Sequence, residues 1–191
     1  MSQTKVQGEY IFSQREMVAG FTFTEDGKFD FFFSYGAVDR TASGTFTIDK
    51  KMIKLQSEKI AGKDFNVISQ SKSGTGYSLK FEDPNPVFLD GIRCTFFIGG
   101  VTHEEFTDQS GIVNVPYPHC DSIFVLHTLF PDFSTLIKDN KNESNHFVLA
   151  LNPSLAQVSF KGIDFTIDDD KTISCMHNYF MPIEDIRFKK Q

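Results

Sequence analysis

Residues 21–33 read FTFTEDGKFDFFF, and this stretch decides the fold class of the chain. On either side of Glu25-Asp26-Gly27, apolar residues alternate with polar ones, which is the period-two pattern of half-buried β-strands. The Asp-Gly pair supplies the positive φ that a tight hairpin turn requires. The stretch therefore predicts two antiparallel strands joined by a short turn.

The same pattern continues outward from this hairpin. Other strands expected before residue 82 are Glu9–Ser13, Thr45–Ile48, Met52–Leu55, Asp64–Ser69 and Tyr77–Phe81. Short strands linked by turns of a few residues pair most simply with their neighbours in the chain. We therefore expect residues 1–82 to form an antiparallel meander, curled or partly closed into a barrel.

The segment Asp83-Pro84-Asn85-Pro86 breaks this pattern, because neither proline can donate a hydrogen bond to a sheet. It predicts a linker over 83–86 and a second all-β domain over 87–191. Strands are expected there at Ile92–Ile98, His103–Thr107, Ile112–Val115, Ser122–Thr128, His146–Leu151, Gln157–Phe160, Asp164–Ile167, Thr172–Met176 and Ile183–Phe188. Residues 131–137 are the one segment expected to hold a short helix.

Residues 86–152 carry a family signal. The segment Thr107-Asp108-Gln109-Ser110-Gly111 matches the Thr-Asp-x-x-Gly hairpin that precedes a strand in transthyretin-like and carboxypeptidase-regulatory-like β-sandwiches, and the order of the surrounding strands resembles those domains. Their Pro-Gly-Tyr-like turn reads Pro131-Asp132-Phe133 here, with Asp in place of Gly. The resemblance implies a seven-stranded sandwich, followed here by extra C-terminal strands, and a role in binding or assembly.

A second resemblance concerns residues 8–81. Gly8-Glu9-Tyr10 stands where lipocalin-type barrels often place Gly-x-aromatic, and the meander that follows is similar to half of such a barrel. The segment before the two prolines is too short for a complete eight-stranded barrel with a ligand cup.

Composition limits the possible partners. The chain has 191 residues, 22 of them Phe, and a net charge of -6. Its basic residues are scattered, whereas a nucleic-acid-binding surface needs them clustered, so we expect neither nucleic acid nor an anionic membrane as partner. No apolar run is long enough to span a bilayer and no signal peptide is evident, which favours the cytoplasm. The three Cys, far apart and odd in number, fit a reducing compartment.

One segment of the first half resembles a binding site. Tyr35, Asp39 and Arg40 place a phenol, a carboxylate and a guanidinium around Gly36, which suggests a loop that contacts a ligand or partner. The alternative is an ordinary hairpin loop, with Asp39 and Arg40 solvated or paired and Tyr35 capping the core.

Cys175 and His177 are the best candidates for a metal site, because residues two apart on a strand share a face. The alternative is a Cys packed in the core and a His at the surface by chance. Since three or four ligands are needed, we expect no metal and no other cofactor.

No catalytic motif is present. His103-Glu104-Glu105 begins like a zincin motif, but Thr107 stands where the second His is needed, and there is no Gly-x-Ser-x-Gly elbow. We therefore expect a soluble, non-enzymatic binding or assembly module that meets a protein or peptide. A carrier of a small apolar ligand in a Phe-lined cavity is the alternative, and an enzyme with an unrecognised site is the third possibility. The oligomeric state stays open.

Overall fold

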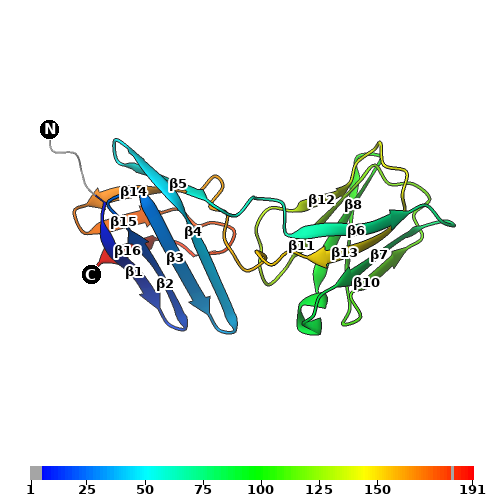
Figure 1. Cartoon of the computed structure of the whole chain (residues 1–191), viewed down its shortest axis with the longest axis horizontal. Helices are drawn as coiled ribbons and strands as arrows, with labels where there is room; N and C mark the ends of the chain where they lie inside the picture. The colour runs from blue at the N-terminus through cyan, green and yellow to red at the C-terminus, as the bar shows by residue number, and fades with distance from the viewer. Residues whose placement is uncertain (1–5, 182) are drawn as a thin grey trace. The chain divides into compact units, whose positions relative to one another are not determined.

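The computed structural model describes residues 6–181 and 183–191, and its regular structure is almost entirely β (Figure 1). The chain divides into two compact units. Unit 1 consists of Met1–Ala61 together with Ala156–Gln191, and unit 2 is Gly62–Leu155. Unit 2 is therefore an insertion within the sequence of unit 1. No helix in the described ranges has the length and apolar character needed to cross a membrane.

Unit 1 is a closed antiparallel barrel of eight strands. The strands are β1 (Gly8–Gln14), β2 (Met17–Phe23), β3 (Lys28–Tyr35), β4 (Val38–Asp49), β5 (Met52–Ser57), β14 (Asp164–Asp169), β15 (Thr172–Cys175) and β16 (Ile186–Lys190). Each strand pairs with the next one in this order, and β16 closes the barrel by pairing with β1, with Tyr10 opposite Lys190.

The barrel confirms part of the predicted meander and corrects the rest. Strands β1 to β5 are consecutive antiparallel neighbours, as expected, and Gly27 at the β2–β3 turn has the predicted positive φ of 79°. The C-terminal strands, however, are not additions to a sandwich: β14 to β16 complete the barrel, with β14 pairing with β5. This closure supplies the three strands that the N-terminal segment lacks.

The predicted strand at 157–160 is wrong. Its only ladder contact is an isolated bridge from Gln157 to Thr41 on β4. The chain then turns into the barrel at Phe160, whose backbone has a φ of 51° and whose side chain is 1% exposed. A bulky residue in this left-handed region is unfavourable, so the burial of its ring must outweigh the cost.

Phenylalanine rings fill the interior of the barrel. The ring of Phe21 on β2 has six Phe neighbours at centroid distances of 4.7 to 6.1 Å, and these are Phe23, Phe29, Phe31, Phe160, Phe165 and Phe188. Phe160 and Phe180 come from connecting segments and also contact each other, at 5.6 Å. The alternating Phe residues of the sequence thus form one core.

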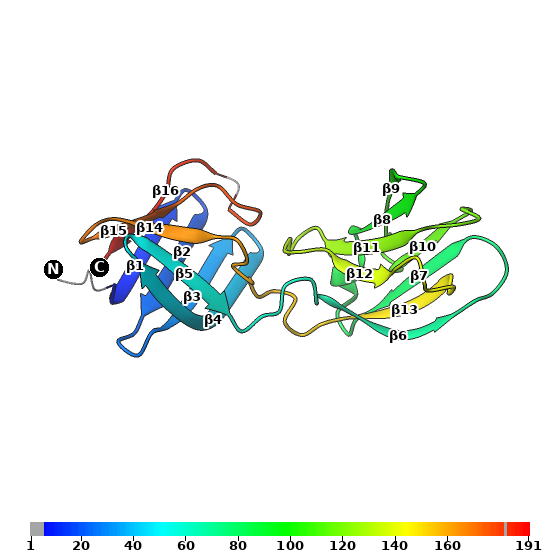
Figure 2. The same ribbon diagram turned by 90° about the horizontal axis from the view of Figure 1, so that it is seen from above.

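Unit 2 contains two four-stranded sheets, seen as two layers in Figure 2. The first has the order β10 (Ile112–Val115), β7 (Tyr77–Glu82), β13 (His146–Leu151), β6 (Phe65–Ser71). The second has the order β12 (Thr135–Lys138), β11 (Ser122–His127), β8 (Ile92–Ile98), β9 (Val101–Phe106). Tyr77 and Phe96 meet between the sheets, with ring centroids 6.3 Å apart.

Two local expectations in this region change. Residues 83–86, expected as an interdomain linker, lie inside unit 2 between β7 and β8. There the Asn85 side chain accepts a hydrogen bond from the Val87 N–H at 3.2 Å and caps the short 3₁₀ helix η1 (Pro86–Leu89). The helix expected at 131–137 is wrong, because Thr135–Lys138 is strand β12, paired with β11.

Candidate functional site

The hairpin of β3 and β4 separates the three predicted contact residues. Tyr35 is 49% exposed at the end of β3 and Asp39 is exposed on β4, whereas Arg40 is 2% exposed. Asp39 and Arg40 are consecutive on a strand, so their side chains point to opposite faces. Tyr35 and Asp39 stay predicted partner contacts at the surface, and Arg40 does not join them there.

Arg40 acts within the barrel. Its guanidinium donates a hydrogen bond to the Gln157 carbonyl at 2.9 Å and lies 5.8 Å from the centroid of the Phe180 ring. Lys59, also buried, donates to the same carbonyl at 2.8 Å. The two cations thus hold the segment that re-enters the barrel after unit 2.

Cys175 and His177 are not placed on one face of a strand. Strand β15 ends at Cys175, so the period-two alternation no longer applies to His177, which is exposed. Burial raises the pKa of the Cys175 thiol to about 12, which disfavours the thiolate that a metal would need. Within residues 6–181 and 183–191, no group of three or more His, Cys, Asp or Glu side chains has the arrangement of a metal site.

Both residues line a groove of about 870 Å³ on the outside of the barrel. Its charged groups include Arg187, which bonds Asp185 at 2.5 Å and lies 3.6 Å from Asp168. The hydrogen bond that the Arg187 guanidinium donates to Asp185 raises the pKa of Arg187, so the guanidinium stays charged. Arg187, Asp185 and Asp168 are thus paired with one another.

A third surface lies on unit 2 and was not predicted. On the sheet β12-β11-β8-β9, alternate residues such as Phe96 and Ile123 are fully buried between the two sheets. The opposite side of the same strands carries five large apolar side chains beside polar ones, which include Thr95, Ser122 and the Arg93–Glu104 ion pair. We call this surface the apolar face, and it consists of Phe97, Phe106, Phe124, Leu126 and Leu136.

The apolar face is continuous across β12, β11 and β8, whereas Phe106 on β9 is separated from Leu126 by Arg93. Leu136 pairs with Phe124, and the rings of Phe124 and Phe97 contact each other with centroids 5.5 Å apart. Leu136 is 50% exposed and Phe106 is 54% exposed. Contiguous exposed apolar side chains of this kind mark interaction surfaces.

A sequence signal for this face was available. An antiparallel sheet with one solvated face shows apolar and polar residues in alternation, whereas strands covered on both faces are apolar throughout. Ile123-Phe124-Val125-Leu126 on β11 is an unbroken apolar run, whereas β8 has Arg93 and Thr95 on its outer face. The run on β11 is the sequence signal that both faces of this strand are to be covered.

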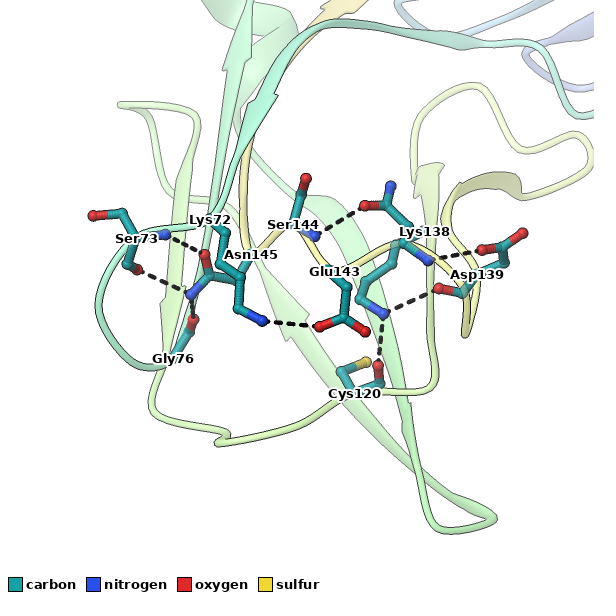
Figure 3. A network of polar contacts seen from close by, with 10 residues as sticks. Lys72, Ser73, Gly76, Cys120, Lys138, Asp139, Glu143, Ser144 and Asn145 are labelled. Carbon is teal, nitrogen blue, oxygen red and sulfur yellow. Dashed lines mark hydrogen bonds and ion pairs between the residues drawn. The ribbon is translucent and has the colours of Figure 1, made fainter.

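A polar network fixes one end of unit 2 (Figure 3). The side chain of Asn145 accepts from the Ser73 N–H at 2.9 Å and donates to the carbonyls of Ser73 and Gly76, at 3.0 and 2.7 Å. Beside it, Lys138 is 3% exposed and donates to the carbonyls of Cys120 and Asp139. Through Asn145, the network holds the β6–β7 loop against the segment that precedes β13.

Comparison with protein families, with curated proteins and with solved structures finds no match to this chain. The function is therefore argued from the chain's own surfaces.

Proposed function

We propose that the chain is a non-enzymatic binding module whose apolar face on unit 2 meets a partner protein. The single observation that carries this proposal is that large apolar side chains, among them Leu136, Phe124 and Phe97, lie together on the outer face of the sheet β12-β11-β8-β9, which unit 2 does not bury. When a partner covers large apolar side chains that were in contact with water, the free energy falls by about 25 cal/mol per Å² of apolar surface buried.

The family resemblance supports the same proposal. Transthyretin-like and carboxypeptidase-regulatory-like sandwiches usually act in binding or assembly, and residues 86–152 resemble them. The two packed sheets of unit 2 agree with a sandwich of that general kind, although the inserted unit begins earlier, with β6 and β7.

Carriage of a small apolar ligand has less support. The interior of the barrel is occupied by the chain's own rings, including Phe160 and Phe180 from the connecting segments. A bound ligand of any size would have to displace several of these close ring contacts, and tightly packed cores resist such insertion.

The test is capture of partners from a lysate of the source cells, analysed by quantitative mass spectrometry. The double variant Leu136→Asp/Phe106→Asp places two charges on the apolar face at positions that are half exposed, so the fold should tolerate them. Phe32→Asp is the matched control, since Phe32 is 44% exposed on the outside of the barrel.

The proposal expects specific proteins that the unaltered chain and the Phe32 variant both capture and that the double variant loses. Size-exclusion chromatography with light scattering, run on the same three proteins, shows whether a second copy of the chain is the partner. The same set of captured proteins on all three baits would overturn the proposal.

A further inference from the structure

Among the strands that the structure describes, those with a free edge lie in unit 2. Within the described residues, every strand of the barrel has a neighbour on both sides, so unit 1 offers no edge for pairing. Unit 2 has four edge strands, namely β6, β9, β10 and β12. An edge strand presents a row of backbone N–H and C=O groups that an added strand can bond.

The four edges differ in how well they could accept a strand. β10 and β12 have only four residues each. β6 has seven, but its pairing with β13 shifts register at Ile68, and a bulge there bends the edge. β9 has six residues that pair with β8 without interruption, from Val101 to Phe106. β9 is therefore the most regular edge for pairing with another chain.

The side chains of β9 define what would pair with it. Glu104 and Glu105 are adjacent, so they carry negative charge on both faces of the strand. Arg93 lies 3.6 Å from Glu104, and Tyr117 donates a hydrogen bond to Glu105 at 3.3 Å. Each of these contacts is made to one oxygen of the carboxylate, Oε1, so the second oxygen can accept a hydrogen bond from an added cation. Pairing of β9 with a second copy would bring like charges together in a chain of net charge -6.

Apolar groups stand at the two ends of the same edge. Val101 is 57% exposed and Phe106 is 54% exposed, and Phe106 also belongs to the apolar face. A strand bound along β9 would thus meet two carboxylates at its centre and apolar side chains at its ends, and it would lie next to the surface assigned to the partner.

We propose that β9 accepts an extended segment of the partner protein as a fifth strand, and that this segment carries two adjacent Lys or Arg residues between β-branched or apolar ones. The inference rests on the proposed function, since it assigns the partner's chemistry and the mode of binding.

The experiment uses the full chain and three labelled decapeptides as probes, with the sequences TVTVKKVTVT, TVTVEEVTVT and TVTVKKPTVT. Fluorescence anisotropy gives the affinity, and hydrogen exchange shows which amides of the chain become protected. The lysine peptide is expected to bind and to protect amides of β9, whereas the glutamate peptide is repelled and the proline peptide lacks a backbone donor.

Two charge-reversed variants of the chain complete the test. Glu104→Lys/Glu105→Lys should lower the affinity of the chain for the lysine peptide by about tenfold or more, since two attractive ion pairs are replaced by repulsion between like charges. Glu82→Lys/Glu143→Lys makes the same change in net charge on exposed residues of unit 2 outside β9, and its affinity should stay within about twofold of the unaltered chain.

Each outcome decides the question. Loss of binding in the β9 variant with protection of β9 in the unaltered chain supports strand addition. Equal binding by the proline peptide, equal binding by the two variants, or no binding of the lysine peptide overturns it. The peptide measurement reports on β9 and the capture experiment on the apolar face, so this test can fail while the partner capture succeeds, and the reverse.

Discussion

Gly44 on β4 lies so close to β5 that a Cβ atom at its position would stand 2.1 Å from the carbonyl oxygen of Gln56. The contact is with backbone near the end of β5, and β4 cannot move away from it without disturbing its pairing with β3, where Gly44 lies opposite Phe29. The absence of a side chain at residue 44 is therefore a condition for closure between these strands.

Gly44→Ala should destabilise unit 1 by about 3 kcal/mol, at the upper end of the cost of overpacking a well-packed site. Urea denaturation followed by tyrosine fluorescence measures the change. Thr45→Ala, an exposed neighbour on the same strand, is the control and should stay within about 0.5 kcal/mol. Equal stability of the two variants would show that β4 and β5 can separate at this point.

Asn145→Ala should destabilise unit 2 by about 3 kcal/mol, because three hydrogen bonds of a buried side chain are lost together. Faster hydrogen exchange of the 71–78 amides is the expected readout. Asn142→Ala serves as the comparison, since its amide bonds Gln70 at the surface at 2.7 Å and its loss should cost less than about 1 kcal/mol. A loop that exchanges alike in both variants contradicts the role given to Asn145.

Arg40→Ala should destabilise the barrel by about 2 kcal/mol, the usual worth of a hydrogen bond to a charged group. Tyr35→Ala and Asp39→Ala should leave the free energy of unfolding within about 0.5 kcal/mol, since both side chains are exposed. Denaturant titration of the three variants checks this. If Arg40→Ala were as stable as the other two, the guanidinium would not hold the segment at Gln157.

The thiols should be unreactive in the folded chain at pH 8. Burial raises the pKa of Cys94 and of Cys175 to about 12, and it also raises the pKa of Cys120. Iodoacetamide labelling followed by mass spectrometry should modify these residues slowly without urea and quickly with it. Fast labelling of the folded chain at any of the three would contradict the burial described.

The same shifts predict how stability changes with pH. An unfolded chain releases its thiol protons near pH 8.5 to 9, whereas the folded chain retains them to about pH 12. The unfolded state therefore binds fewer protons over that interval, so the thiol contribution to the free energy of unfolding should fall as pH rises from 9 to 12. Cys94→Ala should make the free energy of unfolding fall less steeply between pH 9 and 12. If the slope is unchanged, groups other than Cys94 cause the fall.

The local elements were predictable where side-chain alternation is strong. FTFTEDGKFDFFF gives β2, β3 and their turn, because period two and an Asp-Gly pair act within a few residues. Barrel closure was not predictable, since the pairing of Tyr10 with Lys190 joins residues that no local pattern relates. The prolines at 84 and 86 predict a boundary, but both lie inside unit 2, where Pro86 begins a 3₁₀ helix that Asn85 caps.

The candidate sites were likewise predictable only in part. Tyr35 and Asp39 were correctly expected to lie near a hairpin loop, but the direction of Arg40 depends on its register in β4 and on the returning segment at Gln157. The signal for the apolar face is the unbroken apolar run on β11, because a strand with one solvated face would alternate apolar and polar residues.

Closure of the barrel by the last strands sets an order of events during synthesis. Asp164 at the start of β14 leaves the ribosome 107 residues after Ser57 at the end of β5. At typical elongation rates this delay is about 5 to 20 s, far longer than the time in which a hairpin forms. The N-terminal five strands must therefore wait with both of their outer strands unpaired and their Phe side chains uncovered, while the inserted unit is made and folds. Newly made chains are thus most exposed to aggregation, and most in need of a chaperone, in the interval before β14 to β16 arrive.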